Sequence, residues 1–583
     1  MSKVTVIIDN QEVQVPADYT VLQAARSNNV HIPTLCYLEG INEVGACRMC
    51  LVEVEGARGL QTSCTLKVSD GMVVKTNTKK VREARKATLE LLLSDHDREC
   101  LTCDRNRNCE LQTLAEELGI KDVAFEGEKN VNYEDTSSPS IVRDPNKCIL
   151  CGRCVGVCND VQKVGVLGFT NRGFDTVVGP AFDKKMDEIP CINCGQCIAA
   201  CPVGALKEKE EIDYVWEAIE DDNKHVVVQT APAVRAALGE EFGLKMGTSV
   251  TGKMVAALRR LGFDKIFDTD FAADLTIMEE GHELLDRLQN GGKLPMITSC
   301  SPGWIKYCEH YYPEFIDNLS SCKSPHEMLG AVIKSYYAEI NDIDPKDIYV
   351  VSIMPCTAKK FEADREELAA SGYPDVDAVL TTRELAKMVK QTRVDFVELP
   401  DEDFDEVLGE STGASVIFGA TGGVMEAALR TVAEVVTGEQ LEALDFEQVR
   451  GTKGIKEATV NLNGTEVKVA VVHSTGQASK LLDQVKSGEK DYHFIEVMGC
   501  PGGCVTGGGQ PHIKPEDRFK KDVKAERAKA LYTEDKSKKI RKSHENPMIK
   551  KIYDDYFEKP NSHKAHELLH THYVKRENYP LDK

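Results

Sequence analysis

Cysteine is the residue type with the greatest potential for chemistry in this chain, which has 21 cysteines among 583 residues. Two runs of four cysteines share the spacing C-x2-C-x2-C-x3-C, and Pro202 completes the second run. This repeat is typical of two-cluster bacterial ferredoxins, in which the fourth cysteine of each run binds the cluster of the other run. It therefore predicts two 4Fe-4S ligand sets: Cys148, Cys151 and Cys154 with Cys201, and Cys191, Cys194 and Cys197 with Cys158.

A third group of cysteines lies nearer the N-terminus and has the spacing C-x10-C-x2-C-x13-C. The plant-type 2Fe-2S pattern also has a C-x2-C pair inside a cysteine loop and a distant fourth ligand, although its first gap is shorter. Structural zinc is the alternative, but zinc sites usually contain two short C-x2-C knuckles. We expect a 2Fe-2S cluster on Cys36, Cys47, Cys50 and Cys64.

A fourth group, which we call the histidine-cysteine group, combines one histidine with three cysteines in the spacing H-x3-C-x2-C-x5-C. Zinc accepts one imidazole and three thiolates, so the spacing alone leaves zinc open. The position of the group between two iron-sulfur candidates favours a 4Fe-4S cluster on His96, Cys100, Cys103 and Cys109. Four clusters in series would conduct electrons and do no other chemistry, so a reactive site should lie at one end of the series.

The second half of the chain has cysteines at the ends of predicted strands. Three of them follow a predicted strand directly: Cys300, Cys356 and Cys500. Because sites collect at the carboxyl ends of parallel strands, we expect these cysteines to lie close together. The sequence therefore predicts a fifth cluster site, formed by Cys356, Cys500 and Cys504 with a residue of the segment TSCSPGW (298–304).

The hydrophobic pattern predicts the elements that position these residues. Residues 4–16 should form two short strands joined at Asp9-Asn10, and residues 20–30 and 79–97 should form amphipathic helices. Cys308 and Cys322 do not follow strands, and we expect them to be buried as small hydrophobic side chains. From about residue 225, apolar runs alternate with helical segments, which predicts an α/β domain with largely parallel strands. These runs are HVVVQTAP, KLPMITSC, DIYVVSIMPC, ASVIFGATGG, KVAVVHSTG and DYHFIEVMGC.

Composition and charge exclude several classes of protein. Lys and Arg number 72 and Asp and Glu number 94, so the formal net charge of −22 argues against nucleic acids and anionic membranes as partners. The chain has no run of about 18 apolar residues, and residues 1–16 lack the pattern of a secretory signal. We therefore expect a soluble, cytoplasmic protein whose cysteines bind metal rather than form disulfides. The glycine runs FGATGGV and VTGGGQP match neither a dinucleotide-binding nor a phosphate-binding loop.

Three motifs in the second half resemble those of a known family. MPCTAKKFE (354–362) matches the pattern M-P-C-x-x-K-x-x-E, and EVMGCPGGCVTGGGQP (496–511) matches E-x-M-x-C-x-x-G-C-x-x-G-G-G-x-P. Together with TSCSPGW they resemble the three signatures of FeFe-hydrogenases, and the four-cluster N-terminal half is similar to that of the large clostridial-type members. The resemblance implies reversible interconversion of H2 with protons and electrons at an H-cluster. This cofactor is a 4Fe-4S cube bridged by one cysteine to a two-iron unit that carries CO, cyanide and azadithiolate.

The resemblance also implies roles for individual residues. The ligands of the cube would be Cys356, Cys500 and Cys504, with Cys504 as the bridge to the two-iron unit. Lys359 would donate to a cyanide, and Glu362 would hold the Lys359 ammonium. An apolar pocket would exclude water from the open iron and would be lined by Ala231, Pro232, Met354, Phe418 and Met498. A proton relay would consist of Glu280, Glu283, Arg287, Ser320 and, as the last donor, Cys300.

The first signature differs from the family pattern TSCCPxW, in which the first cysteine relays protons and the second binds the cube. Ser301 stands at the second position in this chain. Serine is a hard and weakly acidic ligand, whereas iron-sulfur clusters prefer thiolate. Three interpretations remain open: Ser301 binds the metal as an alkoxide, Cys300 takes the ligand position, or the cube keeps three cysteines and an open or water-filled corner.

The resemblance implies an α/β and α+β multidomain chain with five parts. They are a β-grasp 2Fe-2S ferredoxin domain (1–78), a 4Fe-4S domain with one histidine and three cysteine ligands (79–125), a ferredoxin-like domain with two 4Fe-4S clusters (138–212), an α/β H-cluster domain (213–515) and a C-terminal helical tail packing on the catalytic domain (516–583).

Electrons would pass between the H-cluster and a partner that the chain itself does not contain. The candidates are ferredoxin and flavin-containing, NAD(P)-reducing subunits, because the layout is similar to that of catalytic subunits of NAD(P)-linked or electron-bifurcating hydrogenase complexes. One alternative is a hydrogen sensor or a non-catalytic cluster-binding relative such as the iron-sulfur assembly proteins, which need neither Lys359 nor Glu362. A complex I-like electron-transfer subunit would explain only the N-terminal cluster sites.

Overall fold

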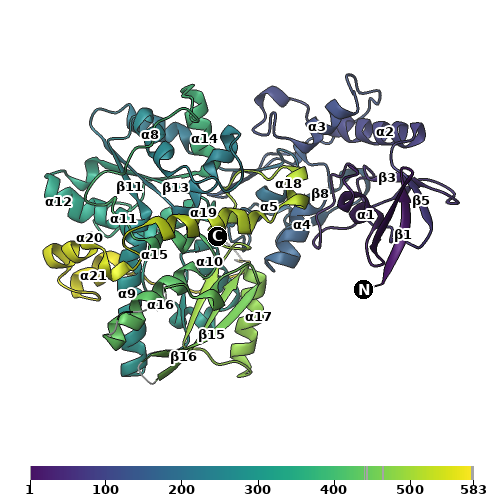
Figure 1. Cartoon of the computed structure of the whole chain (residues 1–583). Helices are drawn as coiled ribbons and strands as arrows, with labels where there is room; N and C mark the ends of the chain where they lie inside the picture. The colour runs from purple at the N-terminus through teal and green to yellow at the C-terminus, as the bar shows by residue number, and fades with distance from the viewer. Residues whose placement is uncertain (1, 439, 441–443, 463–464, 580–583) are drawn as a thin grey trace.

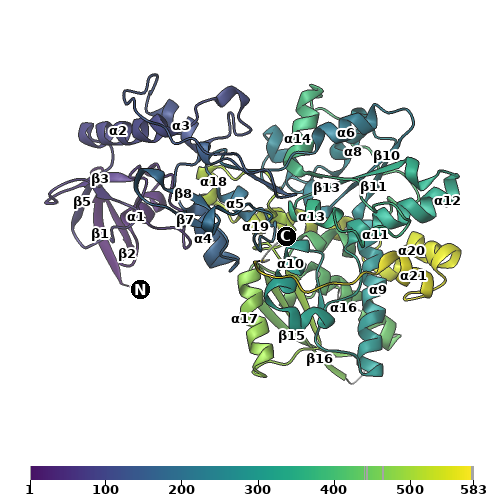
Figure 2. The same ribbon diagram turned by 180° about the vertical axis from the view of Figure 1, so that it is seen from behind.

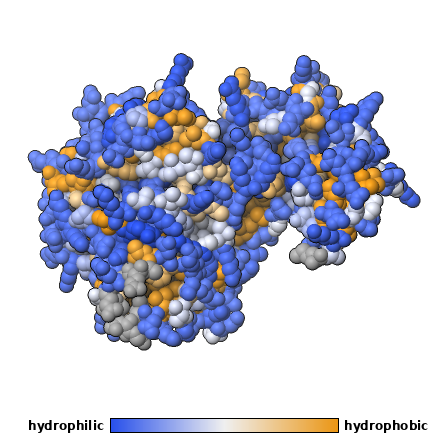
Figure 3. All heavy atoms as spheres, viewed as in Figure 1, coloured by the Kyte–Doolittle hydropathy of each residue, from blue (hydrophilic) through white to orange (hydrophobic). Residues whose placement is uncertain are grey.

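The N-terminal modules lie to one side of a larger body formed by the later part of the chain (Figure 1). The computed structural model describes residues 2–438, 440, 444–462 and 465–579. The view from behind shows the same two-part arrangement (Figure 2). The face in Figure 3 is mainly hydrophilic, with hydrophobic side chains gathered in separate areas. Within the described ranges, no helix is both long and apolar enough to cross a membrane.

The first module is a five-stranded sheet with the order β2-β1-β5-β3-β4. Its first two strands are antiparallel and turn at Asp9 and Asn10, which have positive φ angles of 48° and 69°. The two predicted strands and the helix that follows them are confirmed; Thr20 and Gln23 form a capping box at the start of that helix. The elements are β1 (Lys3–Ile8), β2 (Gln11–Pro16), α1 (Val21–Ser27), β3 (Leu51–Val54), β4 (Gln61–Thr62) and β5 (Met72–Lys75).

The next two modules contain mostly short elements around cysteine loops. The predicted helix in residues 79–97 is confirmed as α2 (Lys79–Asp95), and α3 (Glu110–Glu117) follows it. The module with the repeated cysteine runs is framed by a pair of antiparallel strands, β6 and β9. Its elements are β6 (Ile141–Arg143), α4 (Arg153–Gly156), β7 (Gly168–Thr170), β8 (Val177–Gly179), α5 (Gln196–Ala200) and β9 (Leu206–Glu208).

The larger body is built on two four-stranded sheets with the orders β11-β10-β13-β14 and β12-β17-β16-β15. All strand pairs are parallel except β15 with β16, so the predicted α/β architecture is confirmed. The strands of the first sheet are β10 (His225–Thr230), β11 (Lys265–Asp268), β13 (Ile348–Met354) and β14 (Ala378–Thr381). Those of the second are β12 (Met296–Thr298), β15 (Ile455–Leu462), β16 (Thr465–His473) and β17 (Phe494–Met498).

Helices cover both sheets, and a shared core connects this body with the two-cluster module. Ile192 and Ile198 of that module lie in one buried cluster with Trp304 and Ile495 of the larger body. The accessory cysteines are therefore held against the second sheet. The helices are α6 (Ile212–Ile219), α7 (Pro232–Arg235), α8 (Thr251–Leu261), α9 (Thr269–Asn290), α10 (Pro302–Tyr311), α11 (Pro325–Val332), α12 (Ala338–Asn341), α13 (Ala358–Ala363), α14 (Thr382–Gln391), α16 (Gly423–Thr437) and α17 (Thr475–Lys486).

The prediction of a strand at ASVIFGATGG is wrong. This segment forms the helix α15 (Gly413–Val416) and then a single 3-10 turn. Thr412 caps the helix by accepting a hydrogen bond from the Ala414 amide, and the segment packs against α9, α16 and the later helix α19 (Val523–Ser537). A short apolar run that is buried on every side does not distinguish a strand from a helix by its periodicity.

The C-terminal segment runs back along the molecule as α18 (Pro515–Lys520), α19, α20 (Pro547–Ile552) and α21 (His563–Leu569). In Figure 1, α18 lies beside the N-terminal modules, whereas α20 and α21 lie at the far side of the larger body. Two buried ion pairs hold α19 in place, Arg527 with Glu240 at 2.8 Å and Arg430 with Asp535 at 3.0 Å. The segment is therefore an integral part of the packing of the larger body.

Candidate active site

The candidate site lies between the carboxyl ends of the two sheets. Cys300 and Cys500 each follow a strand of the second sheet by two residues, and Cys356 follows β13 of the first sheet by two residues. Cys504 lies four residues beyond Cys500 in a glycine-rich loop. These four cysteines line one cavity together with Ser301, Lys359 and all five predicted apolar residues, which are Ala231, Pro232, Met354, Phe418 and Met498.

The cavity suits a cofactor that binds thiolates. Cys504 is close enough to Cys300, Cys356 and Cys500 to interact with each of them, and burial raises the pKa of the Cys500 thiol well above its usual value. A cationic partner would therefore be needed to keep such thiols ionised.

The loops that carry these cysteines can close around the cavity only because they contain glycine. A Cβ atom at Gly503 would lie 2.7 Å from the Thr421 amide nitrogen, and one at Gly507 would lie 2.1 Å from the Pro355 carbonyl oxygen. Gly503 also has a φ of 101°, which other residues rarely adopt. The donor set and this close backbone packing fit an iron-sulfur cofactor.

A buried ion network borders the cavity. The Lys359 ammonium donates to Glu362 at 2.6 Å and to the Ser324 hydroxyl at 2.8 Å, and a nitrogen of His326 lies 2.7 Å from the same Glu362 carboxylate. Burial disfavours the charged carboxylate, but Lys359 and His326 outweigh it and hold the pKa of Glu362 at about 2. The predicted pairing of Lys359 with Glu362 is thus present, whereas Ser324 and His326 were missed because no spacing distinguishes them.

Of the predicted proton relay, Glu280, Glu283 and Arg287 lie on α9, Ser320 lies in the segment that follows α10, and Cys300 lies just before α10. Glu283 accepts hydrogen bonds from Arg287 at 2.6 Å and from the Ser320 hydroxyl at 3.0 Å. Ser320 also contacts Glu280, the inner carboxylate, whose two oxygens lie 2.8 and 2.6 Å from the Thr298 hydroxyl. Thr298 was not predicted as a member, although it is the first residue of TSCSPGW.

The protonation of Glu280 should control stability near neutral pH. Burial raises the pKa of Glu280 to about 7, so the folded protein holds this proton more tightly than the unfolded chain. Glu280 therefore destabilises the fold increasingly as pH rises from about 4.5 through 7, because a buried charge replaces a neutral acid. We expect the stability advantage of Glu280→Gln over the wild type to grow by about 1 kcal/mol between pH 6 and pH 8. Chemical denaturation of both proteins at the two pH values measures this difference in the free energy of unfolding. A difference that does not grow with pH would contradict the raised pKa of Glu280.

Ser301 occupies the N-cap position of α10. Its hydroxyl accepts a hydrogen bond from the Trp304 amide at 3.4 Å, and a Cβ atom at Gly499 would lie 2.3 Å from the same oxygen. The Cys300 thiol instead contacts Cys504, and this hydrogen bond, together with the charge of Lys359, lowers the pKa of Cys300 despite burial. The two neighbouring side chains therefore face different parts of the cavity.

The repeated cysteine runs are brought together in the crossed arrangement that the spacing predicts. One cavity is lined by the first three cysteines of one run and the last cysteine of the other: Cys148, Cys151, Cys154 and Cys201. In the other group, Cys158 lies close enough to Cys194 and Cys197 to interact with both. A Cβ atom at Gly508, in the active-site loop, would lie 2.4 Å from the Cys194 carbonyl oxygen. This second group therefore adjoins the active site.

The other two cysteine groups lie further out along the same line of modules. Cys50 and Cys64 have their sulfurs 3.2 Å apart, and the Cys36 amide lies 3.4 Å from the Cys47 sulfur. In the histidine-cysteine group, Nδ1 of His96 is buried without a hydrogen-bond partner, as expected for a ligand atom. Two of its cysteines, Cys100 and Cys109, interact with Cys103, and a Cβ atom at Gly204 would lie 2.7 Å from the Cys103 sulfur. The histidine-cysteine group therefore adjoins the two-cluster module.

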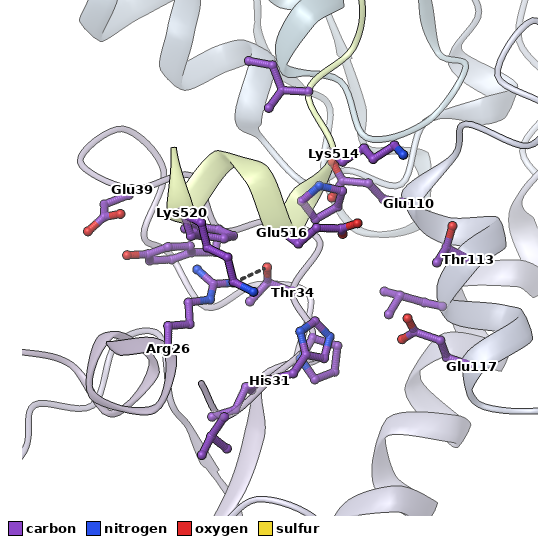
Figure 4. A pocket seen from close by; sticks show the side chains of 18 of the residues that line it. Arg26, His31, Thr34, Glu39, Glu110, Thr113, Glu117, Lys514, Glu516 and Lys520 are labelled. Atoms are coloured by element: carbon purple, nitrogen blue, oxygen red, sulfur yellow. Dashed lines mark hydrogen bonds between the residues drawn. The ribbon is translucent and has the colours of Figure 1, made fainter. Parts of the chain in front are cut away.

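A second pocket, of about 540 Å³, lies where the first module meets α3 and α18 (Figure 4). The Arg26 guanidinium stacks on the Phe519 ring at 3.3 Å from its centre. Glu110 accepts hydrogen bonds from Arg153 at 2.8 Å and from Arg518 at 3.1 Å. These contacts, which we call the α18 junction, tie the first module, α3 and the two-cluster module to the C-terminal segment.

Known protein families match consecutive parts of the chain. Residues 224–508 match the iron only hydrogenase large subunit, C-terminal domain, and residues 521–576 match the iron hydrogenase small subunit. The 2Fe-2S iron-sulfur cluster binding domain matches residues 1–79, the NADH-ubiquinone oxidoreductase-G iron-sulfur binding region matches 85–124, and the NADH-quinone oxidoreductase subunit 3 ferredoxin-like domain matches 138–207.

Two relatives resemble the chain over nearly its full length, and a solved structure resembles part of it. The NADP-reducing hydrogenase subunit HndD of Solidesulfovibrio fructosivorans is 53% identical, with 99% of this chain and all of that protein covered. Iron hydrogenase 1 of Clostridium pasteurianum is 46% identical over 98% of this chain and all of its own length. A solved variant of apo FeFe-hydrogenase HydA1 from Chlamydomonas reinhardtii is 44% identical, covers 62% of this chain and 99% of its own, and has a TM-score of 0.56. The chain belongs to the FeFe-hydrogenase family and is a catalytic subunit with N-terminal iron-sulfur domains.

Proposed function

We propose that the cavity between the two sheets holds the H-cluster on Cys356, Cys500 and Cys504, with the Ser301 oxygen at the fourth corner of the cube. The observation that carries the proposal is the convergence of these four side chains on one buried cavity with Lys359. When bound, this cofactor supplies an open iron site at which H2 is split or formed. Its two-iron unit carries CO, cyanide and azadithiolate.

The protein side chains position this cofactor and exclude water from it. Lys359 binds an anionic ligand of the cofactor, and Glu362 balances the charge of the lysine when the cofactor is absent. Met354, Phe418 and Met498 are at most 4% exposed and keep the cavity apolar. Charge interactions are stronger in such surroundings, so one buried ammonium can fix the orientation of the cofactor.

Protons move between solvent and the cavity through the side chains of α9. Glu283 and Arg287 are partly exposed and form the outer end, and Ser320 links Glu283 to the inner carboxylate Glu280. Cys300 is the last donor, because its thiol faces Cys504 and Lys359 rather than the helix cap that engages Ser301. A carboxyl group with a pKa of about 7, as at Glu280, can give and take protons readily at neutral pH.

The four accessory ligand groups would hold one 2Fe-2S cluster and three 4Fe-4S clusters, which would carry electrons between the cavity and a partner. Two close contacts support a continuous path to the cavity. Cys103 of the histidine-cysteine group adjoins Gly204 of the two-cluster module, and Cys194 of that module adjoins Gly508 of the active-site loop. An NADP-reducing partner subunit in the cytoplasm is the proposed acceptor, because the relative HndD is a subunit of an NADP-reducing hydrogenase.

Infrared spectroscopy of the anaerobically matured protein tests this proposal. We expect CO and cyanide bands together with H2 turnover, and the loss of both in Cys504→Ser. Bands that persist unchanged in Cys504→Ser would show that the cofactor lies elsewhere.

Substitution of Ser301 tests the fourth corner of the cube. A thiolate binds iron-sulfur clusters better than an alkoxide, so Ser301→Cys should shift the infrared bands and slow iron release to a chelator at least about threefold. Ser301→Ala should accelerate iron release. Identical spectra and release rates in all three proteins would exclude Ser301 as a ligand.

A further inference from the structure

Three potential metal ligands gather at the outer end of the relay. A carboxylate oxygen of Glu283, the sulfur of Cys322 and a ring nitrogen of His570 all lie within 4.8 Å of one another. They come from α9, the segment before α11 and the residue that follows α21. Cys322 is 5% exposed and His570 is 9% exposed, whereas the Glu283 side chain reaches solvent. An ion could therefore enter from the Glu283 side.

The second ring nitrogen of His570 is already fixed by a carboxylate. Nδ1 of His570 faces the Cys322 sulfur at 3.9 Å and the Ser321 hydroxyl at 2.8 Å. Nε2 lies 3.2 Å from Glu279, so it can donate its proton to this carboxylate. The lone pair of Nδ1 is then left to bind a metal ion. A carboxylate behind a histidine in this way is the common arrangement at zinc sites.

Glu279 is itself held in place. It accepts hydrogen bonds from the Tyr553 hydroxyl at 2.5 Å and from the Asn561 amide at 2.8 Å, and its side chain is fully buried. The imidazole orientation is therefore set by the packing of the C-terminal segment before any ion arrives.

We propose that Glu283, Cys322 and His570 form a Zn²⁺ site that inhibits proton transfer. One thiolate, one imidazole and one carboxylate, with water in the fourth position, suit the tetrahedral coordination of this borderline-soft ion. Binding releases the Cys322 thiol proton to solvent. The inhibitory part rests on the proposed function of Glu283, because a bound ion would take its carboxylate away from Ser320 and Arg287.

Zinc binding is measured on the holoenzyme, with its iron and sulfide content complete so that the cluster cysteines are occupied. Equilibrium dialysis against ZnCl2 should give one tight zinc per chain. Zinc X-ray absorption should show one sulfur at about 2.3 Å and nitrogen or oxygen neighbours at about 2.0 to 2.1 Å. In Cys322→Ala the sulfur neighbour should disappear and the affinity should fall at least about tenfold. An unchanged sulfur neighbour in that variant would overturn the site.

Cys308→Ala is the matched control, because Cys308 is also buried and lies outside the cluster. It should bind zinc as the wild type does. If Cys322→Ala does not fold, His570→Gln tests the same site and should also lose at least about tenfold in affinity.

Inhibition is measured separately as H2 evolution against free zinc. Zinc should inhibit the wild type reversibly, and Cys322→Ala should keep the same basal rate but need at least about tenfold more zinc. Binding without inhibition would overturn the regulatory role. Dialysis and X-ray absorption test the zinc site even in a protein that evolves no H2. Failure of the proposed hydrogenase function can therefore be distinguished from failure of the zinc site.

Discussion

Replacing Cys300 with alanine should reduce H2 turnover at least about 100-fold, while the infrared bands of CO and cyanide remain. The thiol is the last group of the proposed relay and contacts Cys504. General acid-base groups typically contribute 10²–10⁴-fold to a rate. Turnover and infrared spectra of the same preparation measure the two effects.

Cys308→Ala provides the comparison for this variant, because Cys308 is a buried thiol eight residues further on, outside the cavity. It should keep both turnover and bands. Loss of the bands in Cys300→Ala would assign Cys300 as a ligand of the cofactor rather than a relay group.

The second large effect is expected from Lys359→Met, which should abolish the CO and cyanide bands and lower turnover at least about 1,000-fold. The variant removes the ammonium that lies 2.6 Å from Glu362 and borders the cavity. Removing one partner of a buried ion pair costs about 3 to 5 kcal/mol, and an anionic cofactor ligand would then face Glu362 without a cation between them. Iron content, infrared spectra and turnover measure the result.

The neighbouring Lys360→Met separates loss of the cofactor from loss of stability. Lys360 is also buried and ion-paired, to Glu384 at 3.1 Å, but it does not line the cavity. Both variants should be less stable, and only Lys359→Met should lose the bands. Equal loss of the bands in both would show that Lys359 acts through the fold alone.

The cysteine groups could be predicted from the sequence because ligand spacing within a loop is fixed by the size of a cluster. The positions of Cys300, Cys356 and Cys500 at the carboxyl ends of strands could also be predicted, because these strands alternate clearly with helices in the sequence. The segment at 413–419 was not predictable in the same way, because a short run that is apolar throughout has no period.

Contacts between segments that are distant in the sequence could not be predicted from local sequence patterns. Cys322 and His570 are 248 residues apart, and only the path of the C-terminal helices brings them together. His326, on α11, likewise meets Glu362, on α13, 36 residues further along the chain, and its sequence neighbours carry no sign of this contact. Polar networks that form between elements depend on tertiary packing, which a single sequence does not reveal.

The α18 junction has a consequence for how the protein is made. A ribosome completes the first module more than 400 residues before it reaches Arg518 and Phe519. Until then Arg26 lacks its contact with Phe519 and Glu110 lacks one of its two arginine partners, so the α18 junction cannot form before α18 has been translated. A helix that is translated after the whole of both four-stranded sheets thereby joins the first module to α3, so these modules reach their final contacts late in synthesis.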